Sequence, residues 1–273
     1  MQRVELEEQS NASATAVVTT AQKASQEEQE KAYLASLLLG IPYVVRRRDS
    51  LRKIKEAHNN ADILIMSQDG PILYTGEKVS HKFHLSMAQL RIIAYDRGDV
   101  EHLLAAVGEE PVESFLDCTV GLCSDSLMVS YGHPEIHRFI GLEGNPLLAY
   151  ISNYGCRHFV HESQAVTNAL RRIQLCAMRY EIFLKQAKSK SFDIVYFDPM
   201  FEVPVKESPQ FLALRGHIVE SGLTQEMLEE AKRVARRKVI IKERPFATIF
   251  KMWPPSYLQG GQYSKVAYGV YEV

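Results

Sequence analysis

Asp198, Pro199 and Phe201 directly follow a hydrophobic run in the segment FDIVYFDPMF. A carboxylate, a carbonyl and an aromatic ring in this order suit a planar heterocycle that bears an exocyclic amine. The lone pair of such an amine is delocalised into the ring, and hydrogen bonds to Asp198 and to the Pro199 carbonyl would turn the nitrogen toward tetrahedral geometry. The Phe201 ring can stack on the heterocycle, a contact worth roughly 1 to 3 kcal/mol. Because an Asp-Pro turn after a strand is common, the functional interpretation also depends on two motifs upstream.

The first upstream motif is LDCTVGLCSD, in which an apolar run ends at Asp117 and a helix is predicted to begin near Ser124. Small residues around Gly121 allow backbone N–H groups to approach a bound cofactor closely, and the helix N-terminus favours a carboxylate there. The motif has one glycine where a dinucleotide-binding turn has G-x-G-x-x-G, which disfavours NAD and FAD. The candidate cofactor-binding residues of this motif are Asp117, Thr119, Gly121 and Asp125.

The second upstream motif is Glu143, which ends the run HRFIGLE. An acidic residue at the end of the second strand of a nucleotide-binding sheet can accept hydrogen bonds from both ribose hydroxyls. A surface glutamate in the turn before Gly144 is the alternative. The position of Glu143 after the first motif favours the cofactor role.

The elements that must position these residues begin near residue 111, where short apolar runs alternate with helical patterns. The runs are SFLDCTV, HRFIGLEG, RRIQLCA, FDIVYFDP, KVIIKER and KVAYGVYEV. This alternation predicts an α/β fold with a mainly parallel, doubly wound sheet, and near-continuous apolar strands indicate helices on both faces. Ligands bind beyond the carboxyl ends of strands in such sheets, where the three motifs lie.

Residues 1–80 are predicted to form a small α/β unit with a frayed acidic tail, and residues 81–273 the main domain, with a helical lead-in over 81–110. The unit is expected to contain a helix from about residue 21 to 39 with Tyr33, Leu34, Leu37 and Leu38 on one face, and a short strand at PYVV. Asp49 or Ser50 can cap a second helix through SLRKIKEAH. ADILIMSQDGPILYTG then predicts strand, turn and strand.

The composition of the chain excludes several classes of protein. The chain has 273 residues with a formal charge of -1, which excludes a globally basic nucleic-acid binder but leaves room for a local basic face. The uncharged stretch between Lys31 and Arg46 is interrupted by Ser36, Gly40 and Pro42, so no transmembrane helix is expected. The N-terminus lacks the features of a secretory signal, and we expect a cytoplasmic protein. The four cysteines show no CxxC pairing and predict reduced thiols.

Two basic clusters are candidates for contact with a phosphate backbone, and solvated helix faces are the alternative for each. One comprises Arg46, Arg47, Arg48, Arg52, Lys53 and Lys55; the other comprises Lys232, Arg233, Arg236, Arg237, Lys238, Lys242, Arg244 and Lys251. The pairs His133/His137 and His158/His161 have metal-ligand spacing but match no zinc motif, so no metal is expected. No G-x-S-x-G segment supports a serine hydrolase.

The runs SFLDCTVGLCSDSL, FIGLEGNP, SFDIVYFDPMF and EEAKRVARRKVIIKER resemble the class I S-adenosylmethionine-dependent methyltransferases. More narrowly, the chain is similar to the ribosomal RNA small-subunit methyltransferase J family and its relatives from Gram-positive bacteria. KFHLSMAQLRI resembles a segment that these relatives carry before the catalytic domain. The resemblance covers about residues 81 to 245.

This resemblance implies methyl transfer from S-adenosyl-L-methionine to the exocyclic N2 of a guanine in small-subunit ribosomal RNA. It places Asp117 and Gly121 at the amino-acid end of the cofactor, Glu143 at its ribose, and Asp198 to Phe201 at the acceptor base. The expected contacts to the RNA substrate are Met200, Arg215, Lys242 and Arg244.

Three alternatives stay open. The same amine clamp would fit a DNA adenine or a transfer RNA base. A catalytically silent RNA-binding assembly factor could retain the fold. A nicotinamide oxidoreductase is disfavoured by the single-glycine turn and by the DPMF segment. The sequence does not define the oligomeric state.

Overall fold

The computed structural model describes residues 15–76, 79–199, 223–261 and 264–273. The described residues fall into two compact units, one ending at Phe83 and the other beginning at His84. Met200, Phe201 and Arg215, three of the expected site residues, lie outside the described residues.

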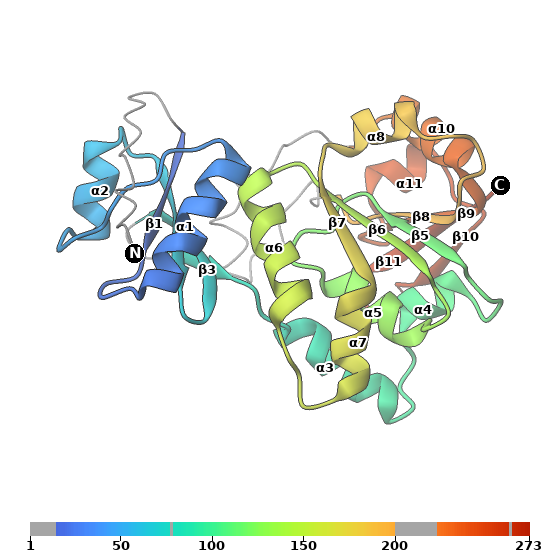
Figure 1. Ribbon diagram of the computed structural model, residues 1–273. Helices are drawn as coiled ribbons and strands as arrows, with labels where there is room; N and C mark the ends of the chain where they lie inside the picture. Colours follow the sequence, from blue (N-terminus) through green and yellow to red (C-terminus); the bar gives the residue numbers. More distant parts are fainter. Residues whose placement is uncertain (1–14, 77–78, 200–222, 262–263) are drawn as a thin grey trace. The chain divides into compact units, whose positions relative to one another are not determined.

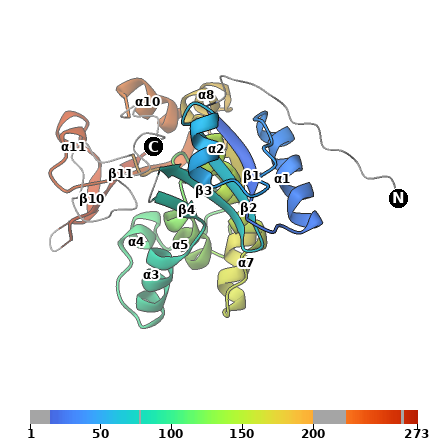
Figure 2. The ribbon, with the colours of Figure 1, turned by 90° about the vertical axis from the view of Figure 1, so that its left-hand side faces the viewer.

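The N-terminal unit is built on a four-stranded sheet of order β1-β2-β3-β4 (Figures 1 and 2). Its elements are β1 Ala16–Thr20, α1 Gln26–Leu39, α2 Leu51–Ala57, β2 Asp62–Ser67, β3 Gly70–Gly76 and β4 Val79–Lys82. β1 and β2 are parallel, and the other pairs are antiparallel. Ile54 of α2 packs with Val17 and Ile63 on one face of the sheet. Because side chains alternate along a strand, Val18 and Leu64 point to the other face and are also buried.

The predicted strand-turn-strand and the Ser50 cap of α2 are confirmed. Three details differ from the sequence prediction. The strand β1 precedes the region where regular structure was expected, and α1 begins later, at a capping box in which Ser25 and Glu28 satisfy each other's backbone N–H groups. PYVV contributes a single bridge between Tyr43 and Val18.

The prediction that α1 buries its leucine face is wrong. Leu34, Leu37 and Leu38 are 62%, 53% and 75% exposed, and the buried side of the helix carries Ala32 and Ala35. Alanine side chains allow a helix to lie close to a sheet, so the small residues face inward although the leucines are more hydrophobic.

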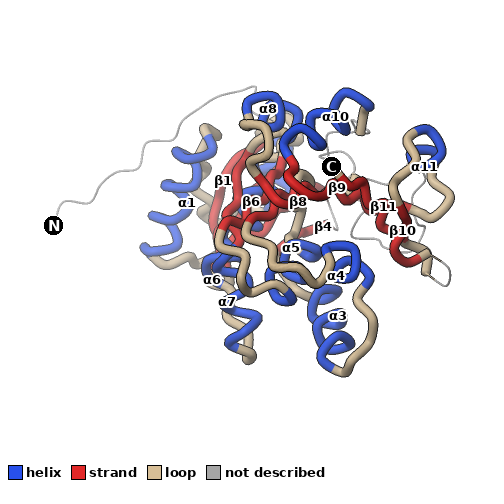
Figure 3. Tube along the Cα trace, turned by 90° about the vertical axis from the view of Figure 1, so that its right-hand side faces the viewer, coloured by secondary structure: helices blue, strands red, loops and turns tan. Residues whose placement is uncertain are grey.

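The C-terminal unit contains a seven-stranded sheet of order β10-β11-β9-β8-β5-β6-β7 (Figures 1 and 3). The strands are β5 Ser114–Asp117, β6 Arg138–Glu143, β7 Ile173–Ala177, β8 Phe192–Phe197, β9 Ala235–Glu243, β10 Tyr257–Gly260 and β11 Ala267–Glu272. β5 to β9 are mutually parallel, whereas β11 is antiparallel to both β9 and β10. The prediction of a mainly parallel α/β sheet is confirmed, and β10 was not anticipated.

Helices cover this sheet on both faces, as Figure 3 shows. They are α3 Ser86–Asp96, α4 His102–Val107, α5 Ser124–Gly132, α6 Pro146–His158, α7 Gln164–Arg172, α8 Tyr180–Gln186, α10 Gln225–Val234 and α11 Thr248–Met252. Leu184 of α8, Leu228 of α10 and Phe250 of α11 share one core cluster with Val195 and Ile241 of the sheet. The chain leaves β5 toward β6 and β7 and returns to β8 on the other side of β5, so a crevice is expected between the carboxyl ends of β5 and β8.

The helical lead-in consists of two helices, α3 and α4, separated near Gly98, which adopts a positive φ of 94°. Met87 and Leu90 recur at helical spacing in this lead-in but are each 61% exposed, and Ala88 and Ile92 are buried instead. Apolar residues occur on both sides of α3, so helical spacing alone could not identify its buried face.

Within the described residues, no helix is long and apolar enough to cross a membrane.

Candidate active site

The carboxyl ends of four parallel strands place most of the predicted site residues at one edge of the sheet. Asp117 ends β5 and pairs in register with Tyr196 of β8, so Asp198 follows two residues beyond that pair. Phe197 pairs with Ile241 of β9, which puts Lys242 beside Asp198. Glu143 ends β6, the neighbour of β5 on the other side.

Asp117 is a buried carboxylate that shapes the turn following its own strand. One oxygen accepts a hydrogen bond from the Thr119 N–H at 2.9 Å, and the other accepts one from the Ser126 hydroxyl at 2.6 Å. Burial raises the pKa of Asp117 to about 7, although both hydrogen bonds oppose this shift. The carboxylate therefore joins β5, the turn and the first part of α5.

The turn after Asp117 is held against β6 at a site where only a glycine fits. The Val120 N–H donates to the Leu142 carbonyl at 3.0 Å, and a Cβ added at Gly141 would lie 2.8 Å from Cγ2 of Val120. Gly121 adopts a positive φ of 48°, and the nearest atom to a Cβ added there would be the Thr119 carbonyl oxygen at 3.9 Å. The space next to Gly121 is thus open, as the close approach of a ligand to the backbone requires.

Glu143 lies beside this turn. It accepts a hydrogen bond from the Asn145 N–H at 2.8 Å, and the N–H groups of Gly121 and Gly144 also bond to it. Burial raises the pKa of Glu143, and these three donors oppose the rise. A carboxylate has about four lone-pair positions, so Glu143, with three donors, retains capacity to accept a bond from a hydroxyl of a ligand.

Asp198 is connected to the same turn through its backbone and to β9 through its side chain. Its N–H donates to Oγ1 of Thr119 at 2.6 Å, and its carboxylate accepts from Nζ of Lys242 at 2.7 Å. The side chain keeps 31% of its surface exposed. Partial burial and the nearby Asp125 raise the pKa of Asp198 to about 6, against the opposing effect of Lys242.

Lys242 also pairs with Asp125 of α5, so its ammonium group lies between two carboxylates. The Nζ to Oδ2 distance to Asp125 is 2.8 Å, and the Lys242 side chain is only 18% exposed. The Tyr196 hydroxyl donates to the same Asp125 oxygen at 2.7 Å. Burial would raise the pKa of Asp125, but Lys242 and Arg91 hold it well below its usual range.

Arg91 extends this set of charges to the lead-in helix. Its guanidinium pairs with Asp125 and, at 2.7 Å, with Glu101, which precedes α4. The chain of contacts Glu101–Arg91–Asp125–Lys242–Asp198 is called the charge network below. It lies within the C-terminal unit and joins α3, α5, β8 and β9.

The structure places most of the expected site residues in two groups that meet at Asp198, whose carboxylate contacts Lys242. Asp117, Thr119, Gly121, Glu143 and Asp198 surround the turn after β5, and Pro199 follows directly. The other group comprises Asp125, expected at the cofactor, and Lys242, expected at RNA; their charged groups contact each other within the charge network. Arg91, Tyr196 and Glu101 were not identified from the sequence. Gly141 could have been noticed only because it interrupts an apolar strand, a position where a glycine often marks a close approach of another backbone.

Most cations of the two basic clusters are engaged within the protein. Side-chain pairs are Arg52–Glu56, Lys53–Asp49, Lys55–Asp62, Lys232–Glu229, Arg233–Glu230, Arg236–Asp193 and Arg237–Glu110. Lys238 donates to two carbonyl groups at the end of α4. By contrast, the side chains of Arg244 and Lys251 make no hydrogen bond or ion pair with any residue in the described ranges.

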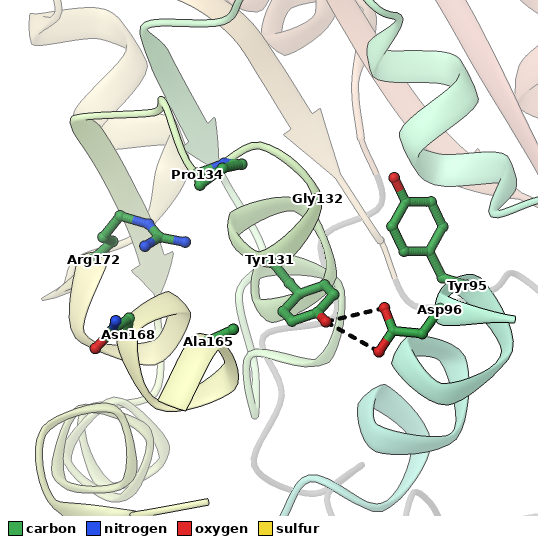
Figure 4. Close-up of a pocket in the computed structure, with 8 residues that line it drawn as sticks. All are labelled: Tyr95, Asp96, Tyr131, Gly132, Pro134, Ala165, Asn168 and Arg172. Atoms are coloured by element: carbon green, nitrogen blue, oxygen red, sulfur yellow. Dashed lines mark hydrogen bonds between the residues drawn. The ribbon is translucent and has the colours of Figure 1, made fainter. Parts of the chain in front are cut away.

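A cavity of about 500 Å³ lies at the C-terminal end of α5, the end opposite Asp125 (Figure 4). Its lining residues are Tyr95, Asp96, Tyr131, Gly132, Pro134, Ala165, Asn168 and Arg172. The Tyr131 hydroxyl bonds to both carboxylate oxygens of Asp96, at 3.0 and 3.1 Å. None of the expected site residues lines this cavity.

Two of the histidines with metal-ligand spacing, His133 and His161, bond to neighbouring residues in the chain. His133 pairs with Glu135 at 3.0 Å, and His161 accepts from the Ser163 N–H at 3.0 Å. In the part of the chain that the structure describes, no three or more His, Cys, Asp or Glu side chains are grouped to hold a metal ion.

Comparison with protein families and curated proteins gives consistent matches. The family model described as "Putative SAM-dependent methyltransferase" matches residues 53–272. The Bacillus subtilis protein YpiP, described as uncharacterized, is 31% identical over 227 residues, which cover 83% of this chain and 88% of that protein.

Other relatives are named ribosomal RNA small subunit methyltransferase J. The protein from Acinetobacter baumannii strain ATCC 17978 is 32% identical over 161 residues, which cover 53% of this chain and 54% of that protein. The protein from Actinobacillus succinogenes is 24% identical over 174 residues, which cover 63% of this chain and 66% of that protein. The match thus spans about half to two thirds of these relatives.

The crystal structure of a SAM-dependent methyltransferase from Neisseria gonorrhoeae has the same fold. Its TM-score is 0.59 at 18% identity, and the alignment covers 94% of this chain and 95% of that chain. The prediction of a Rossmann-like methyltransferase sheet is confirmed.

The charge network leads to a prediction about stability. Lys242→Met should lower the free energy of unfolding by about 3 kcal/mol, because it leaves the buried carboxylate of Asp125 with one cation fewer. Urea denaturation near neutral pH measures this change. The matched control is Lys185→Met, whose ion pair with Glu226 is 55% and 67% exposed, and it should change stability by at most about 0.5 kcal/mol. Equal stability of the two variants would contradict the structural role of Lys242.

Proposed function

The chain belongs to the family of SAM-dependent methyltransferases, and we propose that it methylates an exocyclic amine of an RNA base, with N2 of a guanine in small-subunit ribosomal RNA as the target. S-adenosyl-L-methionine is the cofactor of the family. The main support for the proposal is the hydrogen bond from the Asp198 N–H to Thr119, which fixes a partly exposed carboxylate next to the turn after β5.

The residues around this turn fit the cofactor. We assign the backbone around Gly121 to the amino-acid end, where the space beside the glycine is open. Glu143 is assigned to the ribose, since it is a carboxylate with accepting capacity beside the turn. When bound, S-adenosyl-L-methionine supplies a methyl group attached to a positively charged sulfur.

Asp198 acts on the acceptor amine. In its ionised form it accepts a hydrogen bond from one amine N–H, and the Pro199 carbonyl accepts from the other. These bonds raise the nucleophilicity of a nitrogen whose lone pair is otherwise delocalised. The proton that the nitrogen loses on methylation passes to Asp198 or to water. A fixed position of Asp198 matters because alignment supplies much of the rate in such displacements.

The assignment of RNA as substrate is supported by the names of the relatives that match this chain. The amine clamp itself would also fit a DNA adenine or a transfer RNA base. Purified protein incubated with labelled cofactor and separated nucleic acids distinguishes these acceptors: label is expected in small-subunit ribosomal RNA. Label in DNA or transfer RNA alone would contradict the proposal, and RNA binding without cofactor binding would indicate an assembly factor instead.

Asp198→Asn should reduce the turnover number by at least about 100-fold, because the neutral amide cannot take the proton. Calorimetry should give an unchanged cofactor affinity, since Asp198 is assigned to the acceptor. Asp96→Asn is the matched control, because Asp96 bonds to Tyr131 beside the remote cavity, and it should keep full turnover. Full activity of Asp198→Asn would refute the clamp.

The rate should fall in acid. Asp198 has a pKa of about 6, so it is ionised and able to accept above this pH and becomes protonated below it. The groups around it are Lys242, Asp125, Asp117 and Tyr196. A profile of kcat/KM against pH should therefore rise through about pH 6 and then level off.

Asp117, with a pKa of about 7, titrates in the same range, so the control for this profile is Asp117→Asn. The acidic limb should persist in that variant. If the acidic limb disappears in Asp117→Asn, the limb reports the titration of Asp117 and not that of Asp198.

Glu143→Gln should weaken cofactor binding about tenfold or more, since a hydrogen bond to a charged group contributes about 1.5 to 3 kcal/mol. Titration calorimetry with S-adenosyl-L-methionine measures the change. Glu110→Gln is the control because Glu110 is 82% exposed and pairs only with Arg237 among described residues. An unchanged dissociation constant for Glu143→Gln would remove this residue from the cofactor site.

A further inference from the structure

Phe246 is 84% exposed, the largest exposed fraction among the large apolar side chains of the described residues. It belongs to the segment Arg244–Ala247, called the rim turn here, which follows β9 and precedes α11. An exposed phenylalanine is not unusual by itself. The rim turn is distinguished by its rigidity, its position and its charge.

The rim turn is fixed at both ends. The Ala247 N–H donates to the Arg244 carbonyl at 3.0 Å, and the intervening Pro245 has a restricted φ. The Arg244 N–H donates at 2.7 Å to Glu243, which is 3% exposed. A Cβ added at Gly261 would lie 3.0 Å from Cγ of Pro245, so the proline ring packs closely against that backbone. The exposed ring of Phe246 is thus carried by an ordered turn.

The rim turn lies at the carboxyl end of β9, close to the acceptor carboxylate. Lys242, two residues before Arg244, contacts Asp198 at 2.7 Å. β9 and β8 are adjacent and parallel, so both strands end at the same edge. A molecule bound at Asp198 therefore has the rim turn beside it.

The charge of the rim turn indicates the kind of partner. The Arg244 guanidinium makes no hydrogen bond or ion pair with any described residue. In contrast, Arg236 and Arg237, at the other end of the same strand, are paired with Asp193 and Glu110. A cation without a carboxylate partner next to a solvent-exposed aromatic ring matches single-stranded nucleic acid, which offers phosphates and flat bases together.

We propose that the rim turn binds an unpaired nucleotide adjacent to the methylated one, with Phe246 stacking on its base and Arg244 contacting its phosphate. This inference rests on the proposed function, because it requires an RNA acceptor at Asp198. A base that is methylated on its exocyclic amine must leave its stack, which exposes the faces of its neighbours. The ring of Phe246 restores stacking for one neighbour, and little ordering is needed because the turn is already fixed.

Phe246→Leu and Phe246→Tyr test the proposal, because leucine keeps the apolar character without an aromatic face and tyrosine keeps the face. With a transcript of small-subunit ribosomal RNA, Phe246→Leu should raise KM about tenfold, the loss expected for one stacked base. The turnover number, the cofactor dissociation constant and the melting temperature should stay at wild-type values, and Phe246→Tyr should keep the wild-type KM. Val160→Ala removes another highly exposed apolar side chain, which lies two residues after α6 and is 74% exposed, and should change none of these quantities.

Arg244→Gln gives an independent measurement. In filter binding at several salt concentrations, it should reduce the slope of log K against log salt by about one, the value for one lost phosphate contact. Phe246→Leu should leave this slope unchanged.

Two results would overturn the inference while leaving the proposed function intact. One is a wild-type KM in Phe246→Leu, and the other is a lowered melting temperature in that variant, which would show that the ring packs within the chain. If wild-type protein methylates no RNA, the proposed function itself fails.

Discussion

The placement of one lysine between two carboxylates is the constraint on which the proposed active site depends. Lys242 lies 2.8 Å from Asp125 and 2.7 Å from Asp198 and is mostly removed from solvent. Charges in such surroundings must be paired, because an unpaired buried charge is strongly destabilising. The lysine therefore holds the end of β9, the start of α5 and the residue after β8 in one arrangement. The hydrogen bond from the Asp198 N–H to Thr119 then fixes Asp198 relative to the turn after β5.

The lead-in helix is part of this arrangement. Arg91 of α3 supplies the second cation for Asp125 and is itself held by Glu101. A helix that precedes the sheet in the sequence thereby contributes to the electrostatics of the edge where the site lies. The same residues explain why Asp125 and Asp198, both acidic and both near Lys242, differ in pKa. Asp125 has two cations and a tyrosine hydroxyl, whereas Asp198 has one cation and a neighbouring negative charge.

The sheet and the edge where the candidate residues gather were predictable, because apolar runs identify parallel strands and parallel strands bring their carboxyl ends together. Asp117, Glu143 and Asp198 could be placed at one edge on that basis. The partners of Lys242 could not, since they depend on strand register and on a contact with α5 far away in the sequence. Arg91 was missed for the same reason. The buried face of α1 was misjudged because close packing of small residues outweighed hydrophobicity, whereas apolar residues on both sides of α3 left its buried face undefined.

We propose that Asp198 binds and activates a base amine in small-subunit ribosomal RNA. Mass spectrometry of ribosomal RNA nucleosides tests it most directly, in cells that lack the protein and in the same cells supplied with wild-type or Asp198→Asn protein. We expect N2-methylguanosine in small-subunit RNA to decrease without the protein and to return only with the wild type. An unchanged nucleoside profile, or full restoration by Asp198→Asn, would contradict the claim.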